Sequence, residues 1–149
     1  MTRNDTAALL NELIETSHDG EKGYAKAAKE MSDPKLKAIL VEGAMRCREG
    51  ARELEERVRA LGLEPATGGS VAGAIHRGWL DVKAAVSSRE PRAILEECER
   101  GEDYAKARYA QVLKDDDLDP SLREVVQRQY AGVLQNHNRV KELRDAMPR

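Results

Sequence analysis

Residues 94–113, ILEECERGEDYAKARYAQVL, decide which fold the rest of the chain is expected to adopt. Apolar residues recur here at alternating steps of three and four, which is the spacing of one face of an α-helix. That face contains Leu95, Cys98, Ala105 and Tyr109, and Glu102 occupies the gap where a core residue is expected. Because an isolated carboxylate is costly to bury, Glu102 is a candidate for a polar site inside the protein.

Residues 10–31 repeat this arrangement. Leu10, Ile14 and Tyr24 keep the helical spacing, and Glu21 occupies the gap. Both stretches contain Gly-Glu followed by Tyr-Ala-Lys-Ala, although the two glutamates align only if one residue of slack is allowed. We therefore expect Glu21 and Glu102 to lie on two similar helices and to face each other in the interior.

The composition indicates one soluble helical domain over residues 1–149, with 40% hydrophobic and 35% charged residues and five prolines. The net charge of −2 comes from mixed signs, which argues against a nucleic-acid partner. No apolar run is long enough for a membrane span, and the first residues lack a secretory apolar segment. The protein is therefore expected in the cytoplasm, with Cys47 and Cys98 as buried thiols.

Four long helices and one shorter helix are predicted from periodicity, capping residues and breakers. The predicted ranges are 5–31, 34–61, 71–86, 90–114 and 120–146. Short turns join the first two and the last two long helices, whereas a long connection containing the 71–86 helix lies between the pairs. Two antiparallel hairpins joined by a long crossover are typical of a ferritin-like four-helix bundle, so the fold class is all-α.

Six further segments of the chain form a recognisable pattern, namely residues 13–15, 19–24, 69–79, 96–103, 136–140 and 143–144. In these segments the chain resembles a known family, that of small bacterial ferritin-like four-helix-bundle proteins of unknown function. The resemblance extends over nearly the whole chain and implies a fold without an established activity.

A metal centre is one interpretation of the inward glutamates. A di-iron or di-manganese site in such bundles takes a Glu from each of two helices and a Glu-x-x-His from each of the other two. Glu21 and Glu102 meet the first requirement. The second is not met, because Leu134 stands three residues before His137 and the 34–61 segment contains no histidine. A metal-binding version would use Glu21, Glu102 and His137 to hold iron or manganese, with oxidase or storage activity.

A buried polar network without any cofactor is the favoured interpretation. The hydroxyl groups of Tyr24 and Tyr109 could donate to the two glutamates, and Gln129 and His137 could bridge them. This interpretation favours a non-enzymatic protein with an interaction or assembly role, and it is compatible with a homo-oligomer.

Overall fold

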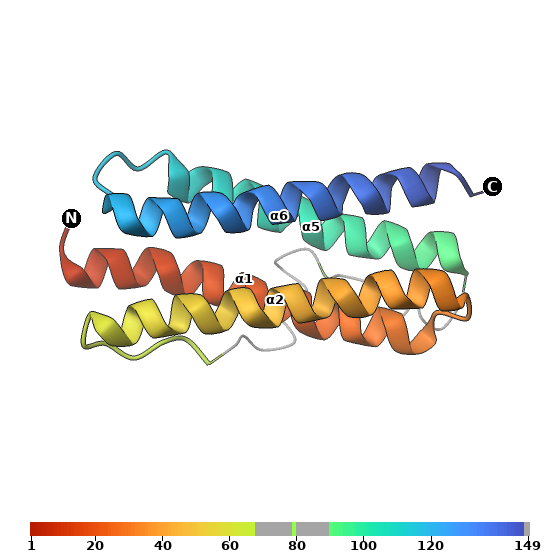
Figure 1. Ribbon diagram of the computed structural model, residues 1–149, viewed down its shortest axis with the longest axis horizontal. Coiled ribbons are helices and arrows are strands. Elements are labelled where there is room, and N and C mark those ends of the chain that lie inside the picture. Colours follow the sequence, from red (N-terminus) through yellow and green to blue (C-terminus); the bar gives the residue numbers. More distant parts are fainter. Residues whose placement is uncertain (68–78, 80–89, 148–149) are drawn as a thin grey trace.

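The computed structural model describes residues 1–67, 79 and 90–147, and over these residues the chain forms four helices and no strand (Figure 1). They are α1 (Arg3–Glu30), α2 (Pro34–Ala60), α5 (Pro91–Leu113) and α6 (Pro120–Asp145). The all-α prediction and the four long helices are confirmed, with ends that differ by a few residues. The predicted helix at 71–86 lies outside the described residues. None of the described helices has the length and apolar character that crossing a membrane requires.

Side-chain caps explain where the helices begin. The hydroxyl of Thr2 accepts a hydrogen bond from the amide of Asp5 at 3.0 Å, and the Asp5 carboxylate accepts one from the amide of Thr2 at 3.1 Å. This reciprocal capping box starts α1 at Arg3, two residues before the predicted start. Asp33 and Asp119 cap α2 and α6, and each precedes a proline that needs no hydrogen-bond partner at the first helical position.

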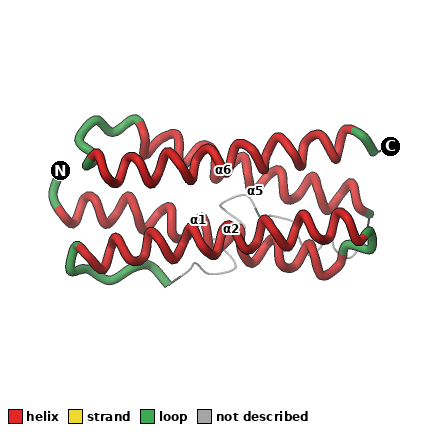
Figure 2. Tube along the Cα trace, viewed as in Figure 1, coloured by secondary structure: helices red, strands yellow, loops and turns green. Residues whose placement is uncertain are grey.

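The helices form two antiparallel pairs, α1 with α2 and α5 with α6 (Figure 1 and Figure 2). Close backbone approaches occur within these two pairs and between α1 and α5. The colours of Figure 1 show that α2 and α5 run in the same direction. α2 therefore ends at one end of the bundle, and α5 begins at the other.

Two apolar clusters fill the two ends of the bundle. One surrounds Leu10, Leu54 and Val126, and the other surrounds Leu40 and Leu95, all of them fully buried. Between the clusters, each of the four helices contributes small or polar residues to the interior, among them Gly20, Cys47, Glu102 and Asn136. The hydrophobic effect therefore stabilises the two ends, and hydrogen bonding must satisfy the middle.

Trp79 packs against glycines of both α1 and α5. A β-carbon placed on Gly23 or on Gly101 would overlap the Trp79 indole ring. The ring therefore fits between the two helices because both positions lack a side chain. The ring of Tyr24 meets Trp79 edge to face, with ring centroids 5.5 Å apart and an interplanar angle of 71°.

We expect Gly101→Ala to lower the free energy of unfolding by about 1–3 kcal/mol, because the indole ring cannot shift without disturbing both helices. The gain in helix propensity, about 1 kcal/mol, offsets only part of this loss. Gly50→Ala is the matched control, since its β-carbon would find its nearest neighbour, Oε1 of Gln129, at 3.5 Å. Urea denaturation measures both variants. Equal stabilisation by the two substitutions would contradict the packing described for Trp79.

Candidate functional site

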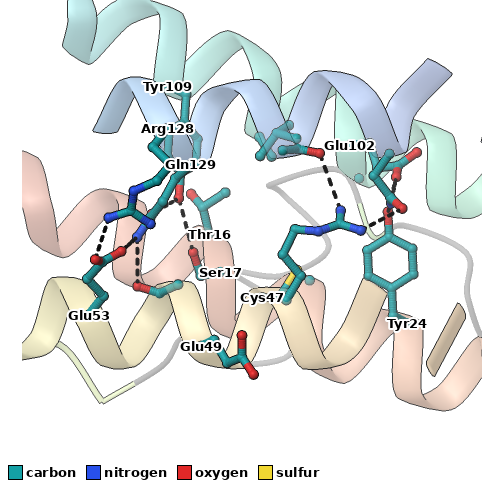
Figure 3. Close-up of a pocket in the computed structure, with 18 of the residues that line it drawn as sticks. Thr16, Ser17, Tyr24, Cys47, Glu49, Glu53, Glu102, Tyr109, Arg128 and Gln129 are labelled. Carbon is teal, nitrogen blue, oxygen red and sulfur yellow. Dashed lines mark hydrogen bonds and ion pairs between the residues drawn. The ribbon is translucent and has the colours of Figure 1, made fainter. Parts of the chain in front are cut away.

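A cavity of about 460 Å³ lies in the polar middle of the bundle (Figure 3). This volume is within the range of about 300–1,000 Å³ that small-molecule pockets have. All four described helices and Trp79 contribute to its lining. Figure 3 shows Tyr24 and Glu102 at one side of the cavity and Tyr109 and Gln129 at the other.

The Glu102 carboxyl is the centre of the first polar group. It is 4% exposed, and its Oε2 accepts hydrogen bonds from the Tyr24 hydroxyl and from the side-chain amide of Asn136. Asn136 Nδ2 also lies 2.6 Å from the Tyr24 hydroxyl oxygen. Arg46 Nη2 donates to Asn136 Oδ1 at 3.3 Å, so the group joins side chains from all four helices.

Burial is the largest of the influences on the pKa of Glu102. Loss of water raises its pKa from 4.5 to about 7, although the hydrogen bonds from Tyr24 and Asn136 and the positive charge of Arg46 act in the opposite direction. The second oxygen, Oε1, is buried and has no hydrogen-bond partner within the described parts of the chain. A buried acceptor without a partner costs about 1–3 kcal/mol, so this oxygen lowers the stability of the folded protein.

Gln129 is the centre of the second polar group. Its Oε1 accepts a hydrogen bond from the Tyr109 hydroxyl at 2.7 Å. Its Nε2 donates to Glu53 Oε1 at 2.8 Å and to the carbonyl of Gly50 at 3.3 Å. Glu53 also forms an ion pair with Arg128. Gln129 thus connects α5 and α6 to α2, on the opposite side of the cavity from Glu102.

Phenols and thiols around the cavity keep their protons. Burial raises the pKa of Cys47 to about 12 and raises the pKa values of Tyr24, Cys98 and Tyr109 well above their ordinary values. Both cysteines are free thiols, as predicted, with Cys98 buried and Cys47 partly buried. These groups therefore act as hydrogen-bond donors or packing groups at neutral pH, and none of them is an activated nucleophile.

The predicted meeting of Glu21 with Glu102 is wrong. The Glu21 side chain is 31% exposed, and it pairs with His18 at 3.6 Å and with Arg48 at 4.0 Å. The inward face of α1 passes through Gly20 instead, where a β-carbon would lie 2.7 Å from Cys47 Sγ. Because successive helical residues are about 100° apart, Glu21 turns away from the interior.

The predicted metal ligands Glu21, Glu102 and His137 are not brought together. Asn136 takes the position beside Glu102, whereas His137, which is 8% exposed, places its Nε2 2.6 Å from Asp103 Oδ1. Sequence reasoning missed Arg46 and Asp103, because the periodicity of one helix does not specify which residues of another helix it meets. Of the predicted site residues, Tyr24 meets Glu102, and Tyr109 meets Gln129.

The raised pKa of Glu102 predicts a pH dependence of stability. Its carboxyl titrates near 4.5 when solvated and near 7 when folded, so the folded protein binds this proton more tightly. This difference in pKa stabilises the folded protein by about 3 kcal/mol below about pH 4.5. The stabilisation is lost as the pH rises through 7. Glu102→Gln should remove this slope in urea denaturation between pH 4.5 and 7.5. Glu56→Gln, at an exposed position of α2, should keep it. Parallel profiles of the wild type and Glu102→Gln would contradict the assignment.

Comparison with known proteins identifies a family for the chain but no function. No curated protein matches the sequence. A family defined only as a domain of unknown function matches residues 5–115, which include α2, α5 and nearly all of α1 and end before α6. Because the match covers most of the 149 residues, the chain belongs to the family described as Domain of unknown function (DUF2383).

Proposed function

We propose that this protein is a non-enzymatic, ferritin-like helical bundle that binds a small uncharged polar molecule in the cavity between its helices. The observation that carries the proposal is a cavity of about 460 Å³ between all four described helices, whose lining combines polar side chains with the buried aromatic rings of Tyr24, Trp79 and Tyr109. The shared direction of α2 and α5 supports the ferritin-like part of the proposal, because a crossover connection produces it.

The charges around the cavity favour an uncharged ligand. The lining contains three acidic residues, Glu49, Glu53 and Glu102, and two basic residues, Arg46 and Arg128. Glu53 and Arg128 neutralise each other as an ion pair, and Glu102 is about half protonated near pH 7. Since the remaining charges nearly cancel, neither an anion nor a cation would gain much electrostatic energy. A hydroxyl or amide group of a ligand could form hydrogen bonds with polar lining side chains such as Thr16 and Ser17 without introducing a charge.

Aromatic side chains favour a ligand with an apolar body. Tyr24, Trp79 and Tyr109 all line the cavity and are each at most 7% exposed. Rings of this kind bind flat or apolar groups by stacked and edge contacts.

The titratable side chains of the lining do not favour catalysis. The described lining residues include no histidine, and burial raises the pKa values of Tyr109 and Cys47 further above neutral pH. This proposal replaces the expected interaction or assembly role with the binding of a small molecule.

Benzyl alcohol and benzamide are suitable probes, because each combines a ring with one uncharged group that can donate a hydrogen bond. Trp79, the single tryptophan of the chain, lies at the cavity and should report their binding through its fluorescence. A probe at about 100 times its Kd should stabilise the protein by about 3 kcal/mol, measured as a rise in melting temperature. Toluene, which lacks a donor, should bind more weakly, since it makes no hydrogen bond with the polar side chains of the lining.

Ala105→Phe should abolish these effects, because Ala105 lines the cavity and the larger ring would occupy it. Ala107→Phe is the matched control, since Ala107 is exposed on the same helix. The proposal is rejected if benzyl alcohol and benzamide change neither the melting temperature nor the fluorescence of the wild type. It is also rejected if both phenylalanine variants respond to the probes as the wild type does.

A further inference from the structure

A second polar cluster lies between α5 and α6, formed by Glu99, Asp103 and His137. Glu99 and Asp103 are four residues apart on α5 and therefore share a helix face, and His137 comes from α6. One potential ligand atom from each of the three lies within 4.8 Å of the others. None of the three is among the residues that line the cavity, so this cluster is separate from the proposed small-molecule site.

The buried imidazole distinguishes this cluster from an ordinary group of surface acids. The His137 side chain is 10% exposed, whereas that of Asp103 is 59% exposed. His137 Nε2 is directed into the cluster, 2.6 Å from Asp103 Oδ1. Its Nδ1 is buried and has no hydrogen-bond partner in the described part of the protein. The ring therefore makes its polar contact with the cluster alone.

Arg144 now supplies the positive charge that Glu99 requires. Its Nη1 lies 2.7 Å from Glu99 Oε2, and its Nη2 lies 2.9 Å from Asp145 Oδ1. The Glu99 side chain is only 14% exposed, so its carboxylate needs a nearby cation. Because Arg144 has a second carboxylate partner in Asp145, it could leave Glu99 without losing all of its pairing.

We propose that Glu99, Asp103 and His137 bind one divalent transition-metal ion, which replaces Arg144 as the cation beside Glu99. One imidazole nitrogen and two carboxylate oxygens form a ligand set that suits Zn²⁺ and similar first-row ions. Such ligands lie about 2.0–2.2 Å from zinc, so His137 Nε2 and Asp103 Oδ1, which are 2.6 Å apart, must separate to admit an ion between them. The exposed Asp103 side chain is free to make that movement. The proposal concerns binding of a single ion and includes no oxidase or storage activity.

Titration calorimetry of the chelator-treated, full-length protein with Zn²⁺ tests the proposal, and the absorption spectrum of bound Co²⁺ reports on its coordination. We expect one ion per chain. Asp103→Asn should weaken binding by about 10-fold or more, and His137→Ala should abolish it. Arg144→Gln should tighten binding, because it removes the competing cation. The variants at Asp103 and Arg144 keep the test valid if the buried His137→Ala variant fails to fold.

His18→Ala is the matched control. His18 also lies between carboxylates, with Nε2 3.1 Å from Glu55 and Nδ1 3.6 Å from Glu21. Because Glu55 and Glu21 contact opposite nitrogens of the His18 ring, a single ion bound to either nitrogen cannot reach both carboxylates. The His18→Ala substitution should therefore leave zinc binding unchanged. Zinc binding that is absent from the wild type, insensitive to both Asp103→Asn and Arg144→Gln, or lost in His18→Ala would overturn the proposal. Ala105→Phe should leave zinc binding intact, which separates this result from the test of the cavity.

Discussion

The hydrogen bonds among Tyr24, Glu102 and Asn136 are the constraint on which the middle of the bundle depends. They place a carboxyl group where a helical bundle ordinarily has apolar side chains. Burying this group is tolerable because two donors reach one oxygen and because the pKa is raised to about 7. The same contacts fix α1, α5 and α6 relative to one another, while the apolar clusters on either side supply most of the stabilisation.

The bundle is packed differently on its two sides. Between α1 and α5, glycines allow the Trp79 ring to fill the space, and the backbones approach closely. Between α2 and α6, long side chains bridge the gap, as in the contacts of Arg46 with the carbonyl of Gly132 and of Gln129 with the carbonyl of Gly50. Bridges of this length leave space between the helices. One glycine from each of the four described helices lines the cavity, so its space comes from small residues on both sides of the bundle, namely Gly20, Gly50, Gly101 and Gly132.

Much of this architecture could be predicted from the sequence, because helical periodicity and Asp-Pro caps are local signals. The buried position of Glu102 could also be predicted, because the apolar residues before and after it in α5 define a single inward face that includes it. Glu21 was misplaced because steps of four then three and of three then four fit a helix equally well between Ser17 and Tyr24. The choice between Gly20 and Glu21 is made by Cys47 on α2, against which only glycine fits. Such a contact is invisible in the periodicity of one helix.

The register of α5 against α6 accounts for both candidate sites. Glu102 and Asp103 are consecutive on α5, Asn136 and His137 are consecutive on α6, and each residue of one pair contacts its counterpart in the other. A change of one residue in this register would separate Glu102 from Asn136 and Asp103 from His137 together. The pair in the interior, Glu102 with Asn136, and the pair nearer the surface, Asp103 with His137, therefore depend on the same register of α5 against α6. Sequence can supply the four residue types, but the packing of the two helices decides which carboxylate receives the amide and which receives the imidazole.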